Sequence, residues 1–191
     1  MSSRNLHCSA TLAAPRAIDA PEHAPPCPGA YVLVIDLDRP LAIALPGRDP
    51  ACLPSGRYLY CGSARGPGGL RARLARHMRR TKRPHWHVDL LTEAGRVAGA
   101  WIVPGGDECA LVAALSHLPM PIPGFGASDC RRCRSHLLRQ PTRGGTQAVH
   151  LALCGYAGQP KTGDLRLGAP DVVSANYRTF TDRPPHKVGD G

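Results

Sequence analysis

Three short apolar segments constrain the fold of this chain more than any other feature of its sequence. They span residues 30–37, 57–62 and 97–103, and their β-branched and aromatic residues favour strands. Pro and Gly residues interrupt the connection between the first two segments, which argues against a crossover helix and predicts an antiparallel pair. Aromatic residues make up only 5% of the chain, so aliphatic side chains have to fill the core.

A helix is predicted between the second and third strands, over residues 69–80. Four residues recur at the i, i+3, i+4 and i+7 spacing that places them on one helix face: Leu70, Arg73, Leu74 and His77. The two leucines are suited to anchoring the helix, and Arg73 and His77 lie one turn apart on the same face.

A second helix is predicted after the third strand. Asp107 follows two glycines and is a suitable N-cap, and the helix extends to about residue 118 with the apolar face Leu111, Ala114, Leu115 and Leu118. Residues 149–153 are a candidate short strand. The expected order is therefore β-β-α-β-α, and the expected fold class is α+β, with a small three-stranded mixed sheet flanked by helices.

The expected organisation is one folded domain between two irregular ends. Residues 1–27 are interpreted as a disordered leader, residues 28–153 as the domain, and residues 154–191 as an irregular C-terminal tail. No apolar run approaches the about 18 residues of a membrane span, and the N-terminus lacks the apolar segment of a signal peptide. The sequence therefore predicts a cytoplasmic protein without a membrane partner.

Basic residues outnumber acidic ones, with 24 Lys and Arg against 14 Asp and Glu and a formal net charge of +10. Eight of the basic residues lie between Arg65 and Arg83, a stretch that contains no acidic residue. A concentrated basic stretch is suited to phosphate groups, and nucleic acid is the commonest polyanionic partner. The alternative is a solvated basic helix face that binds nothing.

Two tyrosines are predicted to meet at one end of the sheet. Tyr31 opens the first strand and Tyr60 closes the second, and these two ends are neighbours in an antiparallel pair. Gly29 and Gly62 flank them and leave room for a backbone or a phosphate group. The alternative is a pair of half-buried strand tyrosines without a function.

Two charged residues on the predicted helices are candidates for the same site. Arg73, held by a packed helix face, is a preplaced guanidinium for a phosphate group. Glu108, in the first turn of the second helix, offers the hard oxygen ligand that Mg²⁺ prefers. The alternatives are a solvated arginine and a first-turn acid favoured by the helix dipole.

Four motifs together resemble the GIY-YIG nuclease superfamily: GAY at 29–31, YCG at 60–62, LRARLARH at 70–77, and the later Glu108. The chain is more similar still to the Uri-type endonuclease branch in the segments YLYCGSARGPGGLRARLARH, KRPHWHVDLL, DECALVAAL and GFGASDCRRCRSHL. The resemblance covers roughly residues 28–138. It implies a GIY-YIG nuclease-like fold and assigns active-site roles to Tyr31, Tyr60, Arg73, His77 and Glu108.

The sequence departs from the superfamily pattern at three points. Ala30 and Cys61 stand where the two strand motifs have isoleucine, and both are neutral changes on a strand. Many members have a late Asn near the site, and this chain has no clear equivalent, with Ser128 and Asp129 as candidates to replace it.

The resemblance implies metal-assisted hydrolysis of a nucleic-acid phosphodiester. Mg²⁺ or Mn²⁺ on Glu108 would bind the scissile phosphate as a Lewis acid, and Arg73 would neutralise the charge that develops on it. Tyr31, helped by His77, would orient or deprotonate the attacking water, and Tyr60 would contact the phosphate.

The segment KRPHWHVDLL, residues 82–91, extends the candidate nucleic-acid surface. The expected contacts are Arg71, Arg76, Arg80, Lys82, Arg83, His85 and His87. The two histidines face the same side if the segment is extended. A role as metal ligands is a less favoured alternative for them. Trp86 is open to two interpretations, stacking on a base or packing in the core.

A cysteine cluster carries the donors of a metal site. Cys130, Cys133 and His136 form a CxxC motif followed by a histidine, and Cys109 is a candidate fourth ligand, which suits a structural Zn²⁺. The alternatives are reduced, half-buried thiols and, less favoured, a redox-active CxxC pair.

The leading hypothesis from the sequence is a divalent-metal-dependent endonuclease that cuts DNA, in repair or in defence against foreign DNA. The second hypothesis is a non-catalytic nucleic-acid-binding module with a Cys/His metal knot, and the third is a thiol-based redox protein. A carboxylate amid arginines and tyrosines favours the first, because binding alone does not require it. The sequence leaves the oligomeric state open.

Overall fold

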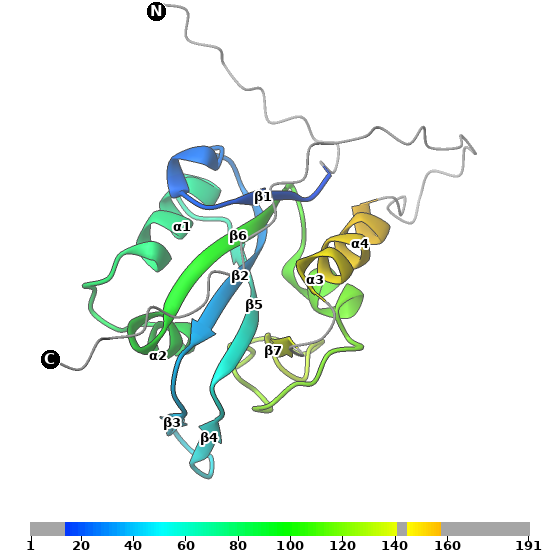
Figure 1. Ribbon diagram of the computed structural model, residues 1–191. Helices are drawn as coiled ribbons and strands as arrows, with labels where there is room; N and C mark the ends of the chain where they lie inside the picture. Colours follow the sequence, from blue (N-terminus) through cyan, green and yellow to red (C-terminus); the bar gives the residue numbers. More distant parts are fainter. Residues whose placement is uncertain (1–13, 141–144, 158–191) are drawn as a thin grey trace, which may run out of the picture.

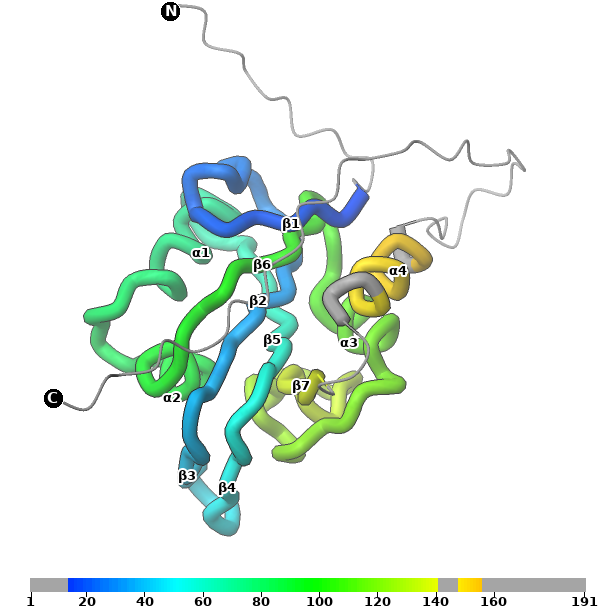
Figure 2. Tube along the Cα trace, viewed as in Figure 1, coloured from blue at the N-terminus to red at the C-terminus, as the bar shows by residue number. Residues whose placement is uncertain are grey.

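The computed structural model describes residues 14–140 and 145–157, and a five-stranded sheet with helices on both faces forms its centre (Figure 1). The sheet order is β1-β6-β2-β5-β7. Its strands are β1 (Arg16–Ile18), β2 (Gly29–Leu37), β5 (Gly56–Ala64), β6 (Arg96–Pro104) and β7 (Leu137–Gln140). A separate two-stranded hairpin, β3 (Leu41–Ile43) with β4 (Ala51–Leu53), extends from the far ends of β2 and β5 (Figure 2).

Four α-helices and one short 3-10 helix accompany the strands in the described residues. They are η1 (Pro21–His23), α1 (Gly69–Met78), α2 (His87–Ala94), α3 (Glu108–Ala114) and α4 (Gly145–Ala157). The order β-β-α-β-α expected from the sequence is present as β2, β5, α1, β6 and α3, with the other elements added to it. None of these helices has the length and apolar character that a bilayer crossing requires.

The central strands bury both of their faces, which explains why residues 30–35 are continuously apolar instead of alternating. Alternate side chains of β2 belong to two separate cores. Tyr31, Leu33 and Ile35 pack with α1 and α2 on one face. Val32 and Val34 pack with α3 and α4 on the other (Figure 1). Side chains that alternate along a strand point to opposite faces, so each face can carry its own chemistry.

The expectation of a three-stranded mixed sheet is wrong in strand number and direction. Every strand pairing in the described residues is antiparallel, including the expected pair β2–β5, in which Gly29 is opposite Ala64 and Leu37 opposite Gly56. The two missed strands, β1 and β7, are edge strands of three and four residues. Such short strands contain too few residues to show a period of two.

Four further expectations need correction. Part of the expected leader is ordered, because β1 and η1 lie within residues 14–27, whereas residues 1–13 lie outside the described residues. Residues 149–153 are helical, because Val149 and Leu153 bury one face of α4 at a spacing of four. The segment around His87 is not extended, since α2 begins there. The helix after Asp107 ends at Ala114 instead of about residue 118.

The expected C-terminal tail is described only in its first residues. Residues 154–157 belong to α4, so the domain extends slightly beyond residue 153, and residues 158–191 lie outside the described residues.

Candidate functional site

A buried hydrogen bond joins the tyrosine of the first motif to the histidine of the first helix. The Tyr31 hydroxyl lies 2.7 Å from His77 Nε2, and both side chains are at most 2% exposed. Strand β2 places Tyr31 opposite Gly62 of β5, where a methyl group would overlap the tyrosine hydroxyl. A glycine at this position therefore lets the Tyr31 ring lie across β5 toward α1.

The surroundings of His77 keep its imidazole neutral. Burial lowers the pKa of His77 to about 3, and Arg73, Lys82 and Arg76 act in the same direction against the opposing effect of Asp89. His77 Nδ1 makes no hydrogen bond, but it lies 3.9 Å from the negatively charged Asp89 Oδ1. The negative charge on that side favours a hydrogen on Nδ1 and leaves Nε2 to accept the Tyr31 hydroxyl hydrogen. Burial raises the pKa of Tyr31, with Tyr60 adding to this effect and Arg73 opposing it.

Asp89 supports this pair from behind, and the sequence argument overlooked it. Its carboxylate is fully buried and accepts two hydrogen bonds of 2.9 Å from Arg76 and two more from the backbone N–H groups of His85 and Trp86. Burial alone would raise the pKa of Asp89, but these hydrogen bonds lower it to about 2. The sequence signal for this role was an acidic residue three positions after Trp86, which is the N3 position of a helix capping box.

The guanidinium groups of two arginines stack on the Trp86 ring, so its faces are not open to a base. The guanidinium carbons of Arg73 and Arg76 each lie 4.2 Å from the centroid of the Trp86 ring. His77 is a further neighbour, with ring centroids 5.7 Å apart. These contacts favour the packing interpretation of Trp86, and they hold the Arg73 guanidinium beside the Tyr31–His77 pair.

Tyr60 lies on the same sheet face as Tyr31, at the expected end of the sheet. Tyr60 lies opposite Leu33 on β2 and is therefore the diagonal cross-strand neighbour of Tyr31. Both tyrosines belong to the same core. Its ring packs edge-on against Phe125, and burial raises its pKa. A side chain at Gly126 would overlap the Tyr60 ring, so the loop before β7 passes close over this tyrosine.

Glu108 approaches the same end of the sheet from the opposite face. Strand β6 ends at Pro104, which lies opposite Gly29, and Gly29 lies opposite Ala64, so the ends of three strands meet there. Gly105, with φ of 72°, then turns the chain into α3. Asp107 caps this helix by accepting a hydrogen bond from the Ala110 backbone N–H, as expected.

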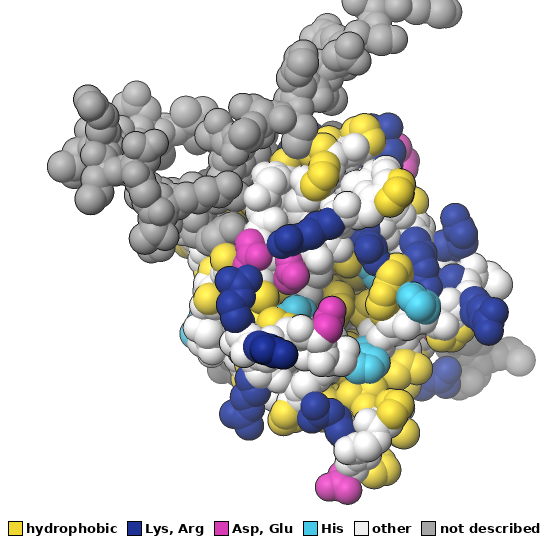
Figure 3. Space-filling view, turned by 180° about the vertical axis from the view of Figure 1, so that it is seen from behind, with side chains coloured by type: hydrophobic (Ala, Val, Ile, Leu, Met, Phe, Trp, Pro, Cys, Tyr) yellow, Lys and Arg dark blue, Asp and Glu magenta, His cyan; other side chains and the backbone are white. Residues whose placement is uncertain are grey.

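The Glu108 carboxylate has an unsatisfied oxygen. Its Oε2 atom is buried without a hydrogen bond, and Arg65 Nη2 lies 3.6 Å away. The side chain as a whole is 21% exposed. A buried carboxylate oxygen in this state gains from a cation. Figure 3 shows a hollow in the middle of one face of the molecule, with His, acidic and basic side chains gathered around it.

The basic residues expected on the nucleic-acid surface fall into two groups. Arg76, Lys82, Arg83 and His85 line one pocket of about 520 Å³ near the end of α1. Arg71 donates to the Ala24 carbonyl, Arg80 is exposed, and His87 accepts a hydrogen bond from the Gly126 backbone N–H. His85 and His87 belong to no group of three potential metal ligands among the described residues.

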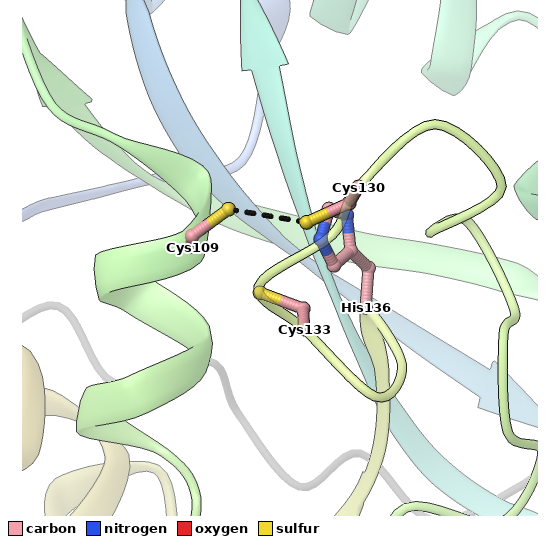
Figure 4. Close-up of side chains that lie close together, drawn as sticks. All are labelled: Cys109, Cys130, Cys133 and His136. Carbon is pink, nitrogen blue, oxygen red and sulfur yellow. Dashed lines mark hydrogen bonds between the residues drawn. The ribbon is translucent and has the colours of Figure 1, made fainter.

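The expected cysteine cluster converges in space (Figure 4). Ligand atoms of Cys109, Cys130, Cys133 and His136 all lie within 4.8 Å of one another, and the sulfurs of Cys109 and Cys130 are 3.5 Å apart. Cys109 comes from α3, the other two cysteines from the loop before β7, and His136 from the residue preceding that strand. The four residues could therefore hold a metal ion.

Backbone hydrogen bonds fix the loop that carries three of these residues. The His136 backbone N–H donates to the Phe125 carbonyl, and the Cys61 backbone N–H donates to the His136 carbonyl. The imidazole Nε2 of His136 is buried without a hydrogen bond in the described structure. Burial raises the pKa of Cys133 to about 12, with the neighbouring thiols of Cys109 and Cys130 adding to the effect.

A protein-family model described as a domain of unknown function, DUF123, matches residues 30–154, about two thirds of the chain. No curated protein matches the chain. No solved structure matches it either.

Proposed function

Because the chain belongs to the DUF123 family, whose function is unknown, its activity has to be inferred from its own residues, and we propose that it is a divalent-metal-dependent endonuclease that hydrolyses DNA phosphodiester bonds. The observation that carries this proposal is the buried hydrogen bond between Tyr31 and His77, with Arg73 held beside it. The resemblance of the sequence to GIY-YIG nucleases supports the same conclusion.

The Tyr31–His77 pair fixes the position of the tyrosine oxygen. The neutral Nε2 of His77 accepts the Tyr31 hydroxyl hydrogen, so the lone pairs of the tyrosine oxygen are left to accept a hydrogen bond from the attacking water and orient it. The water oxygen bonds to phosphorus as the bond from phosphorus to the leaving oxygen breaks, and the proton that the water loses ends on the leaving oxygen. Arg73 neutralises the charge that develops on the phosphate oxygens. The Asp89 carboxylate, on the Nδ1 side of the His77 ring, favours the tautomer that leaves Nε2 free to accept.

Glu108 is the residue that would hold Mg²⁺ or Mn²⁺. Its unsatisfied Oε2 atom fits a cation, and Mg²⁺ is commonly bound by one or two carboxylates together with water and substrate phosphates. A metal there supplies Lewis-acid stabilisation of the phosphate. The Arg65 guanidinium, 3.6 Å from the same oxygen, holds the carboxylate in place.

The cysteine cluster is proposed as a structural Zn²⁺ site. Three thiols and one imidazole are a common tetrahedral ligand set, and the unsatisfied His136 Nε2 fits this set. Four protein ligands leave no position open for a reacting water, so this metal would stabilise the fold and fix the start of α3, where Cys109 and Glu108 are neighbours.

The second candidate is a nucleic-acid-binding module without catalysis. The observation that favours it is the burial of Tyr31 and Tyr60, both at most 8% exposed, because buried tyrosines also serve as core residues. This candidate gives no role to the unsatisfied carboxylate of Glu108.

A nicking assay separates the two candidates. Purified protein is incubated with plasmid, branched and single-stranded DNA in Mg²⁺ or Mn²⁺, and Tyr31→Phe is compared with Tyr58→Phe. Tyr58 lies on the same sheet face, and its hydroxyl donates to the Pro54 carbonyl. The endonuclease proposal expects a loss of about 10²-fold or more in Tyr31→Phe, because the attacking water loses the oxygen that orients it, and little change in the matched control.

Glu108→Ala, compared with the exposed Glu93→Ala, completes the test. Cleavage should be abolished in Glu108→Ala while DNA binding persists, because the carboxylate repels phosphate unless a metal bridges the two. Binding without cleavage of any substrate by the wild-type protein would instead favour the non-catalytic module.

A further inference from the structure

A pocket beside the end of α1 is lined almost entirely by basic side chains. Its volume is about 520 Å³, and its walls are Arg76, Arg79, Lys82, Arg83, Pro84 and His85. Figure 3 shows Lys and Arg side chains crowded along the corresponding side of the molecule. A pocket with this lining is suited to an anion, and its size exceeds what a single water or small ion needs.

The charges of this pocket are mostly uncompensated within the protein. Arg76 forms its ion pair with Asp89. Arg79, Lys82 and Arg83 form no ion pair with a carboxylate of the described residues, so three positive charges share one small volume. Burial lowers the pKa of Lys82, with Asp89 and Glu93 opposing and Arg76 and Arg79 adding to the effect. An anion in the pocket relieves this repulsion.

Hydrogen bonds to carbonyl groups hold the pocket in shape before any ligand binds. Lys82 Nζ donates to the carbonyls of His77 and Arg79, at 3.0 and 3.2 Å. Arg76 Nη2 donates to the Arg83 carbonyl at 3.0 Å. The C-terminal end of a helix is electronegative and repels anions. Lys82 covers these carbonyls, so the end of α1 presents a positive surface instead.

The pocket adjoins the Tyr31–His77 site through shared residues. Arg76 lines the pocket, and its guanidinium stacks on the same Trp86 ring that carries Arg73. The carbonyl that holds Lys82 belongs to His77, the partner of Tyr31. Consecutive phosphates of a strand that reaches Arg73 would therefore continue toward Arg79 and Arg83.

We propose that this pocket is a subsite for one backbone phosphate of the nucleic-acid strand, a short distance along the strand from the phosphate that is cut. This subsite rests on the proposed endonuclease function. It adds a direction for the bound strand, which would run from the Tyr31–Arg73 site past the end of α1. Arg79 and Arg83 bind the phosphate directly, and Lys82 holds the shape of the pocket.

The test is the salt dependence of DNA binding by the double variant Arg79→Ala/Arg83→Ala. The matched control, Arg39→Ala/Arg48→Ala, removes the same charge from exposed residues near the far end of β2. Binding is measured in the Glu108→Ala background, so that it does not depend on cleavage. Each lost phosphate contact lowers the slope of log affinity against log salt by about 0.9, so one lost phosphate should lower it by about 1, and the control should leave it unchanged.

A scan with single methylphosphonates identifies the phosphate. Each backbone phosphate of a short duplex is neutralised in turn, and affinity is measured for wild-type and double-variant protein. One position outside the cut site should weaken the wild-type complex about tenfold and leave the double variant unaffected. Equal sensitivity of both proteins at every position would overturn the subsite, even if the wild-type protein cleaves DNA.

Inorganic phosphate provides the last arm of the test. Binding of free phosphate is monitored by NMR through the signals of the exposed His85 ring. Saturation at micromolar phosphate would identify a small-anion site and overturn the assignment to a nucleic-acid strand. Weak binding of free phosphate, in the millimolar range, with tight binding of the duplex is the expected result. A wild-type protein that binds no DNA would overturn this inference, and a protein that binds but never cuts would overturn only the endonuclease.

Discussion

The two faces of the central sheet hold their polar groups in different ways. On the face covered by α1 and α2, the Tyr31 hydroxyl is hydrogen-bonded to His77 Nε2, and the Asp89 carboxylate accepts four hydrogen bonds, two of them from Arg76. Between these two groups, His77 Nδ1 lies 3.9 Å from Asp89 Oδ1 and makes no hydrogen bond. On the side of α3 and the loop before β7, the four ligand atoms of the cysteine cluster lie within 4.8 Å of one another, and the sulfurs of Cys109 and Cys130 are in contact. Glu108 Oε2 and His136 Nε2 lack hydrogen bonds there, although Arg65 lies 3.6 Å from the glutamate oxygen.

This difference separates a face whose charged groups are held mainly by hydrogen bonds from one whose ligand atoms could hold a metal ion. Hydrogen bonds and stacking fix the first set, so its geometry should survive the removal of metal. The second set contains His136 Nε2, which is buried without a hydrogen bond, and a metal ion bound to the cysteine cluster would remove that desolvation cost.

The largest effect is expected from removing the Zn²⁺ that we propose for the cysteine cluster. Chelation, or Cys130→Ser, should lower the free energy of unfolding by several kcal/mol, less than the about 10 kcal/mol that a zinc ion contributes to a peptide without a core. Cys52→Ser is the control, because Cys52 is an exposed free thiol. Elemental analysis of protein purified without chelator should find about one zinc per chain.

Hydrogen exchange gives this prediction a spatial readout. Loss of the metal should deprotect the start of α3 and the loop that carries Cys130 and Cys133, and it should leave α1 and α2 protected. Uniform loss of protection on both faces would show that they are not independent, and the absence of stoichiometric metal would remove the site.

The central part of the fold could be predicted from sequence, and the edges could not. Strands β2, β5 and β6 are long and strongly apolar, and α1 shows its buried positions by a clear helical period. The edge strands β1 and β7 are held by pairing with β6 and β5, so their own residues carry little pattern. The apolar pattern of residues 149–153 fits a strand or a helix, and only packing against α3 decides for the helix.

The candidate site follows the same division. The resemblance placed Tyr31 and His77 in one site, and ligand chemistry suggested a cluster of Cys109, Cys130, Cys133 and His136. The structure joins Tyr31 to His77 and, separately, brings the four members of the cluster together. Asp89 was missed because a lone acid on a helix has many ordinary explanations, and its role depends on the burial that α1 provides through Arg76. The stacking of two arginines on Trp86 likewise depends on tertiary contacts.

The next effect concerns the face covered by α1 and α2. Arg73→Ala should lower the cleavage rate by about 10²–10³-fold, the scale for losing one preplaced donor to the transition state. Arg73→Lys should recover little of this loss, because an ammonium reproduces neither the planar fork nor the stacking on Trp86. Arg39→Ala, an exposed arginine at the far end of β2, is the control.

Single-turnover measurement decides whether Arg73 acts in the chemical step. The rate of that step should fall while the affinity for DNA changes by less than about tenfold, because the positive charge of the wider surface is retained. Full activity in either Arg73 variant would remove the residue from the site and would leave its stacking on Trp86 as a purely structural contact.

The smallest effect is the contribution of Asp89 to stability as a function of pH. Its folded-state pKa of about 2 lies below the ordinary value of 3.8, so the carboxylate stabilises the folded protein fully above about pH 4. This contribution, about 2 kcal/mol from a shift of nearly two pKa units, is lost as the pH falls toward 2.

Asp89→Asn isolates this contribution from other acid effects. Protonation also releases metal from cysteine and histidine ligands, but that loss is common to wild type and variant and cancels in their difference. The difference in free energy of unfolding should be largest near neutral pH and should decrease by about 2 kcal/mol between pH 5 and pH 2. Asp49→Asn, at an exposed residue of the β3–β4 hairpin, should stay within about 0.5 kcal/mol of wild type throughout. A pH-independent difference for Asp89→Asn would mean that the hydrogen bonds from Arg76 and from the backbone N–H groups of His85 and Trp86 do not distinguish the charged carboxylate from a neutral amide. The carboxylate would then give the folded state no electrostatic stabilisation.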